Sequence, residues 1–132
     1  MVSDHVNHAR NFLKKAQEYL AAAEDSLAAE RHTPAADDAI HAGINAKDAV
    51  VTALTGTTSK GKNHSAAAGE LKEALGQRPD AATAERALRE LISAKSDMEY
   101  GVALVTAAKA EPLGRRARTL VELAIQIVRL GR

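Results

Sequence analysis

The fold is decided by residues 4–31, DHVNHARNFLKKAQEYLAAAEDSLAAER. Their apolar residues recur at alternating steps of three and four, which gathers side chains on one face of an α-helix. These residues are Val6, Ala9, Leu13, Ala16, Leu20, Ala23 and Leu27. Most of the charged residues fall off this seam, so we expect an amphipathic helix from about Asp4 to about Arg31.

A second helix is expected from about Pro34 to Leu54. Thr33 before Pro34 is a typical pair of N-cap and first helical residue, and Gly56 is placed to end the helix. Gly43 falls on the apolar side in mid-helix, where a glycine costs roughly 1 kcal/mol against alanine. We expect it to permit a close approach to the first helix or to a partner.

Three further helical segments follow a polar loop. A short helix is expected at about Ser65–Leu75, and Asp80 can cap the next one, whose pattern weakens at 96–101. An extended piece through 102–105 then precedes the last helix. Thr106 can cap this helix, but a proline six residues into a helix would kink it, so a proper start at Pro112 is the other possibility.

Composition agrees with one helical domain over residues 1–132. Aromatic residues make up only 2% of the chain, so alanine, leucine, valine and isoleucine must build the core. Five helices with short loops predict an all-α, up-and-down bundle. There is no cysteine, which excludes disulfides and thiolate chemistry. No apolar run approaches the roughly 18 residues of a membrane span, so we expect a cytoplasmic protein without a membrane partner.

The net charge of +1 gives no global attraction to nucleic acid. Charged residues are nevertheless mostly arginine from Leu113 to Arg132. The simpler interpretation is a solvated last helix with cations near its C-terminus, where the helix dipole favours them. The alternative is a surface that touches phosphates.

Common enzyme and metal motifs are missing from the sequence. Residues 59–62 lack the spacing of a nucleotide-binding P-loop. No His-Glu-x-x-His zinc helix occurs, and no Glu-x-x-His pair supports a di-iron bundle. His5 and His8 are interpreted as exposed residues near a helix end. We therefore expect neither a metal nor a cofactor.

A polar line runs along the second helix through Asp37, His41, Asn45 and Asp48. This spacing places the four side chains on one face. The simpler interpretation is the solvated side of an amphipathic helix. The alternative is that Asn45 and Asp48 line a polar groove, with Asp48 at the edge of the core and in need of a partner.

The loop after Gly56 is the best candidate for chemistry. Lys60 and Lys62 supply two ammonium groups, and Asn63 and His64 stand where the next helix begins, with free amides that suit a phosphate. His64 can also transfer protons near neutral pH. The simpler interpretation is that Asn63 or His64 caps the helix and that both lysines are solvated.

Several short motifs, taken in order, carry a family resemblance over nearly the whole chain. They are Phe12-Leu13-x-x-Ala16, Ala39-Ile40 through Ala46-Lys47-Asp48-Ala49-Val50, Gly56, Lys62-Asn63-His64-Ser65, Leu91-Ile92-x-x-Lys95 with Tyr100, and Val105-Thr106-x-x-x-Ala110. In this order they resemble the HEPN family, the higher-eukaryote and prokaryote nucleotide-binding helical domains, and especially its short single-domain actinobacterial members. The resemblance implies a helical bundle that dimerises through its second and third helices.

Many HEPN relatives are metal-independent ribonucleases that use an arginine followed, four to six residues later, by a histidine. Others are toxins silenced by a nucleotidyltransferase antitoxin that modifies a tyrosine near that histidine. In this sequence the nearest analogue of the motif is Lys60-x-x-x-His64, and lysine lacks the bidentate fork of arginine. No tyrosine follows His64 closely, and no histidine follows at the required spacing after Arg10, Arg31, Arg78 or Arg86.

Three functions remain open. The favoured one is a non-catalytic HEPN-like homodimer that binds RNA, a nucleotide or a partner protein, such as a nucleotidyltransferase in a toxin–antitoxin or defence context. Phosphate would meet Lys60, Lys62 and Asn63, beside a groove lined by Asn45 and Asp48. The second is a metal-independent endoribonuclease with His64 as acid and base and with Lys60 or Lys62 as electrostatic stabiliser. The third is a structural protein-interaction module that uses the alanine- and glycine-containing face of the second helix.

Overall fold

Five α-helices make up the computed structural model, which describes residues 4–57 and 64–130. They are α1 (Asp4–Ala28), α2 (His32–Thr55), α3 (Ala67–Leu75), α4 (Ala81–Tyr100) and α5 (Ala107–Leu130), with a 3₁₀ turn, η1 (His64–Ala66), before α3. No strand occurs in the described ranges. The predicted all-α class is therefore confirmed.

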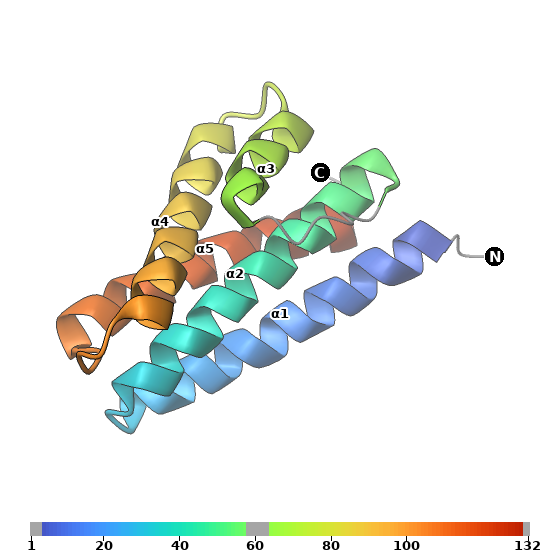
Figure 1. The fold of residues 1–132 in the computed structure, drawn as a ribbon. Helices are drawn as coiled ribbons and strands as arrows, with labels where there is room; N and C mark the ends of the chain where they lie inside the picture. The colour runs from blue at the N-terminus through green and yellow to red at the C-terminus, as the bar shows by residue number, and fades with distance from the viewer. Residues whose placement is uncertain (1–3, 58–63, 131–132) are drawn as a thin grey trace.

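Helix α2 lies at the centre of the bundle and contacts each of the other four α-helices. Helix α1 runs antiparallel along one side of it, α5 passes behind it, and the α3–α4 hairpin packs on the remaining side (Figure 1). The largest fully buried side chains are aliphatic apart from one threonine: Ile40, Val50, Leu71, Leu88, Leu91, Leu120, Val121 and Thr52. The expectation of an aliphatic core is confirmed.

The corner between α1 and α2 is tighter than the sequence pattern predicts. Helix α1 ends at Ala28, three residues before the expected end, and Glu30 adopts a left-handed φ of 59° that turns the chain back. Arg31, not Thr33, takes the N-cap position of α2, and its side chain makes no capping hydrogen bond. Pro34 lies in the first turn, where its missing N–H has no helical partner to lose.

Two helix ends follow the sequence prediction closely. Gly56 ends α2 in the left-handed conformation, and its N–H donates to the Thr52 carbonyl. Gly76 ends α3 with a positive φ of 59°. Asp80 stands at the N-cap of α4, but its carboxylate makes no capping bond and instead accepts from Arg78 Nε at 3.3 Å.

Of the two starts left open for the last helix, the one after Thr106 is correct and the one at Pro112 is wrong. Helix α5 begins at Ala107, and Pro112 lies inside it. A proline there forfeits the hydrogen bond to the carbonyl four residues earlier, which belongs to Ala108, and its ring crowds that carbonyl. Ala108 is exposed, so water can serve that carbonyl. The expected non-helical piece through 102–105 is confirmed, and it bends at Ala103.

Gly43 permits a close approach, but not to the first helix. A Cβ added at Gly43 would overlap Leu91 Cδ1 of α4 and lie 3.3 Å from Leu120 Cδ1 of α5. The small face of α2 is therefore filled by the chain's own core. The burial of Gly43 counts against an interaction module that uses this face as its contact surface.

Candidate functional site

The turn between α4 and α5 is the most exposed apolar part of the described chain. Four large hydrophobic side chains are exposed within the described residues, and three of them lie here. Val102 is fully exposed, while Tyr100 and Leu104 are 85% and 87% exposed. Val102 and Leu104 flank the bend at Ala103. Because contiguous exposed apolar surface usually marks an interaction site, we name residues 100–105 the hydrophobic turn.

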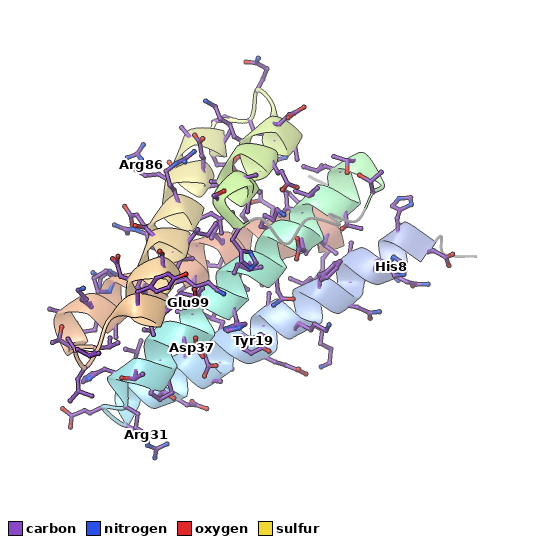
Figure 2. The ribbon with its side chains drawn as sticks, in the orientation of Figure 1. His8, Tyr19, Arg31, Asp37, Arg86 and Glu99 are labelled. Carbon is purple, nitrogen blue, oxygen red and sulfur yellow. The ribbon has the colours of Figure 1, made fainter. Side chains whose placement is uncertain are left out.

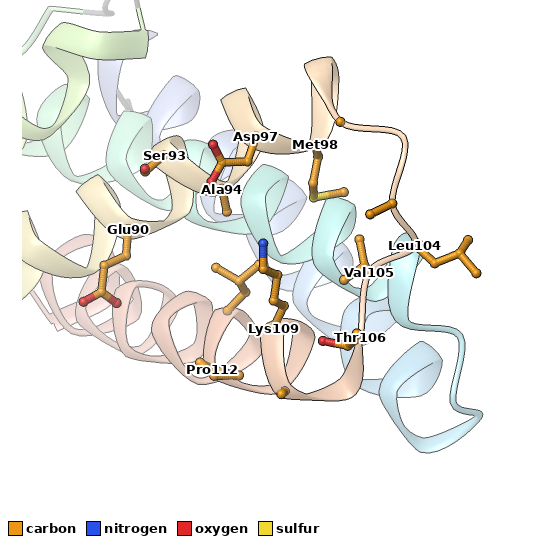
Figure 3. A pocket seen from close by; sticks show the side chains of 14 residues that line it. Glu90, Ser93, Ala94, Asp97, Met98, Leu104, Val105, Thr106, Lys109 and Pro112 are labelled. Atoms are coloured by element: carbon orange, nitrogen blue, oxygen red, sulfur yellow. The ribbon is translucent and has the colours of Figure 1, made fainter.

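An open hollow of about 670 Å³ adjoins the hydrophobic turn. It lies between the C-terminal half of α4 and the start of α5 (Figure 3). Ala94, Met98 and Val105 line it with apolar side chains, and Leu104 borders it with a side chain that extends outward (Figure 3). The turn and the hollow therefore form one surface with a projecting part and a recessed part.

The charged residues of the hollow stand on opposite walls. Lys109 rises from α5 toward α4, where Asp97 stands (Figure 3). Within the described part of the chain neither side chain belongs to an ion pair. Glu90, in contrast, accepts a hydrogen bond from Arg116 Nε. The charges of Asp97 and Lys109, which have opposite signs, are thus available to a partner beside the apolar lining.

A second cluster of charged groups joins α2 to α3. Lys47 is only 4% exposed, and its Nζ lies 3.2 Å from Asp48 Oδ1 and 3.4 Å from Glu70 Oε2. A buried ammonium needs such partners, because burial disfavours an unpaired charge. Because Glu70 belongs to α3, its pairing with Lys47 holds α3 against α2. One ammonium faces two carboxylates, so no spare cation remains among these three residues.

Asp48 is the most perturbed member of this cluster. Burial raises the pKa of its carboxyl above the ordinary 3.8, Lys47 opposes the shift through charge and a hydrogen bond, and Glu70 adds to it. The nearby His64 lowers the pKa in turn. Asp48 lies at the edge of the core, as expected, and its partner in the described structure is its sequence neighbour Lys47. The loop lysines, which could also provide a partner, lie outside the described residues.

The predicted loop site is only partly within the described structure. His64 opens η1 half-buried and close enough to Asp48 to influence its charge. Lys60, Lys62 and Asn63 lie outside the described residues. His64 therefore lies near the cluster formed by Lys47, Asp48 and Glu70. The placement of His64 relative to the loop lysines stays a prediction.

Asn45 lies in a different groove, between α1 and α2. It lines this groove with Lys15 and Asp38, and its side-chain amide donates to the His41 carbonyl at 2.9 Å. The His41 ring stacks on Tyr19 of α1 with centroids 5.1 Å apart. Figure 2 shows Tyr19 on the side of α1 that adjoins α2. Asn45 therefore lies beside α1 on a helix face that it shares with Asp48, and a groove lined by both stays a prediction.

The hydroxyl of Thr52 is the buried side-chain polar group without a hydrogen-bond partner in the described structure. Such a group costs about 1–3 kcal/mol. We expect Thr52→Val to raise the free energy of unfolding by about 1 kcal/mol, measured by urea denaturation. Thr55→Val is the control, because Thr55 Oγ1 donates to the Val51 carbonyl at 2.7 Å. A less stable Thr52→Val protein would show that the hydroxyl has a partner.

The arginines of α5 mostly serve packing between helices. Arg118 forms a bidentate pair with Glu24 of α1, which raises the pKa of the guanidinium. Arg116 pairs with Glu90 of α4, and Arg129 donates to Gln17 of α1. These contacts favour the simpler interpretation of the arginines over a surface for phosphates.

The described residues offer neither a metal site nor a membrane span. Across residues 4–57 and 64–130, no group of three or more His, Asp or Glu side chains is arranged to hold a metal ion. None of the helices in those ranges has the length and apolarity to cross a membrane. The chain matches no family model, no curated protein and no solved structure. The HEPN resemblance therefore stays a prediction from short motifs.

The hydrophobic turn is not among the sites predicted from the sequence. The signal was present, because Val102, Leu104 and Val105 form an apolar run between two helices, where connecting segments are usually polar. Their exposure depends on how α4 and α5 cross, however, and that is a property of the folded chain. A short apolar run alone does not separate a buried strand from an exposed loop.

Proposed function

We propose that this chain is a non-catalytic helical protein that binds a partner protein through the hydrophobic turn and the adjoining hollow. The exposure of Val102 and Leu104 beside an apolar recess carries the proposal. An apolar anchor that enters a partner, surrounded by a polar rim, is the usual centre of a protein interface. RNA recognition would instead need a basic or base-stacking surface.

The charged cluster gives less support to RNA binding. Lys47 is held by Asp48 and Glu70, so moving it to a phosphate would leave two carboxylates unpaired. His64 lies close enough to Asp48 to influence the pKa of that carboxyl, and a carboxylate there repels an approaching phosphate. A toxin–antitoxin context and a nucleotidyltransferase partner rest on the HEPN resemblance alone.

Site-specific photocrosslinking in the host cells tests the proposal. A benzophenone amino acid at Leu104 is expected to give one discrete protein adduct. The same group at Ala21, which is exposed on α1, is expected to give none. Ala94→Trp should suppress the adduct by filling the hollow, and its circular dichroism should show that the helices still form.

Two results would contradict the proposed function. One is the absence of any discrete protein adduct at residue 104. The other is cleavage of RNA by the purified protein, with a 2′,3′-cyclic phosphate product and loss of activity in His64→Ala. That outcome would favour the ribonuclease hypothesis.

A further inference from the structure

We infer that the partner is a second copy of this chain, with the hydrophobic turn of each copy seated in the hollow of the other. This inference rests on the proposed function of the same surface. The projecting residues Val102 and Leu104 and the recess are adjacent in one chain. A twofold axis beside such a surface brings each projection to the partner's recess, because an isologous interface uses the same patch twice.

The unpaired charges are complementary in this arrangement. Asp97 stands on the α4 wall of the hollow and Lys109 on the α5 wall (Figure 3). Each copy therefore brings one carboxylate and one ammonium to the interface. A twofold association lets Lys109 of one copy meet Asp97 of the other, and the pairing forms twice. A partner surface of a single charge sign would pair with only one of these two residues, either Asp97 or Lys109.

The size of the surface predicts a weak dimer. Fourteen residues line the hollow, and Tyr100 and Val102 adjoin it. A standard interface uses roughly 20–30 residues on each side. We therefore expect a dissociation constant in the micromolar range. Leu104, which becomes buried on association, is the main anchor, and the two Lys109–Asp97 pairs lie at the rim.

Sedimentation equilibrium of the purified full chain tests this arrangement. The protein is expected to pass from monomer to dimer as its concentration rises through the micromolar range. Leu104→Asp should raise the dissociation constant at least tenfold, since it places a carboxylate in the apolar recess. Leu104 is 87% exposed, so the variant should keep its helical circular dichroism. Leu54→Asp, at an exposed residue on α2, is the matched control and should leave the dimer unchanged.

Charge reversal identifies the second copy as the partner. Asp97→Lys and Lys109→Asp are each expected to weaken the dimer about fivefold, because each creates like-charge pairs across the interface. The double variant restores opposite pairing in both places and should return to within about twofold of the original dissociation constant. The inference is overturned if Leu104→Asp still dimerises, or if the double variant stays as weak as the single variants.

Failure of this inference is distinguishable from failure of the proposed function. A chain that stays monomeric at every concentration, yet gives a discrete adduct with another protein at residue 104, overturns the second copy and keeps the surface. A monomeric chain without an adduct overturns both. Crosslinking a mixture of ¹⁴N- and ¹⁵N-labelled chains supports the inference when the adduct joins one light copy to one heavy copy.

Discussion

Replacing Gly43 by leucine is expected to destabilise the protein by at least about 3 kcal/mol. Even a Cβ at this residue would overlap Leu91 Cδ1, and Leu120 Cδ1 lies 3.3 Å from it. Both leucines are buried at the centre of the bundle, so neither can swing into solvent. The added side chain must therefore push α4 and α5 away from α2. Urea denaturation followed by circular dichroism measures the loss.

Two alanine variants separate crowding from helix propensity. Gly43→Ala gains up to roughly 1 kcal/mol of propensity but meets the same leucine, so we expect a net loss of about 1 kcal/mol. Gly69→Ala is the control, because nothing lies within 4 Å of an added Cβ there. It should gain up to about 1 kcal/mol. A Gly43→Ala protein that gains as much as Gly69→Ala would refute the close contact.

The helices could be predicted from the sequence because their signals are local. The seam through Leu13 and Leu20 identifies α1, and Gly56 marks the end of α2 through its backbone freedom. Pro112 shows where local reasoning fails. Its cost depends on whether the Ala108 carbonyl reaches water, and that is decided by which side of α5 the bundle covers.

Contacts between helices were beyond the sequence. The periodic pattern places Gly43 on a buried face of α2, but it does not say which helix approaches that face. The same holds for Lys47, which appears in the sequence as an ordinary helical lysine and is buried against α3. The polar line was predicted as one face, yet its residues meet different neighbours, α1 at Asn45 and α3 near Asp48.

The second large effect is expected from Lys47→Met, which should lower the free energy of unfolding by about 2 kcal/mol at neutral pH. Methionine keeps most of the volume of the buried stem, so the loss comes from charge. The Asp48 side chain is only 21% exposed and would lose its closest cation. Glu70 is more exposed, so water screens its interaction with Lys47 and the loss there is smaller. Urea denaturation gives the value.

Two further variants show whether the pairing is the cause. Adding Asp48→Asn to Lys47→Met removes the unpaired carboxylate, and the double variant should recover more than half of the loss. Lys95→Met is the matched control. Lys95 pairs with Glu99 on the surface of α4 at 3.1 Å, and such a pair contributes about 0.5 kcal/mol or less.

The pH dependence provides an independent check. The pKa of Asp48 is raised in the folded protein, so the folded state holds this proton at a pH where the unfolded chain has released it. Ionised Asp48 therefore lowers stability above the folded pKa, and this cost vanishes as the pH falls below the unfolded value of 3.8. Without Lys47 the pKa rises further and the cost grows. The difference between wild type and Lys47→Met should therefore be largest at neutral pH and shrink on acidification, and a pH-independent difference would mean that packing of the stem, not charge, is lost.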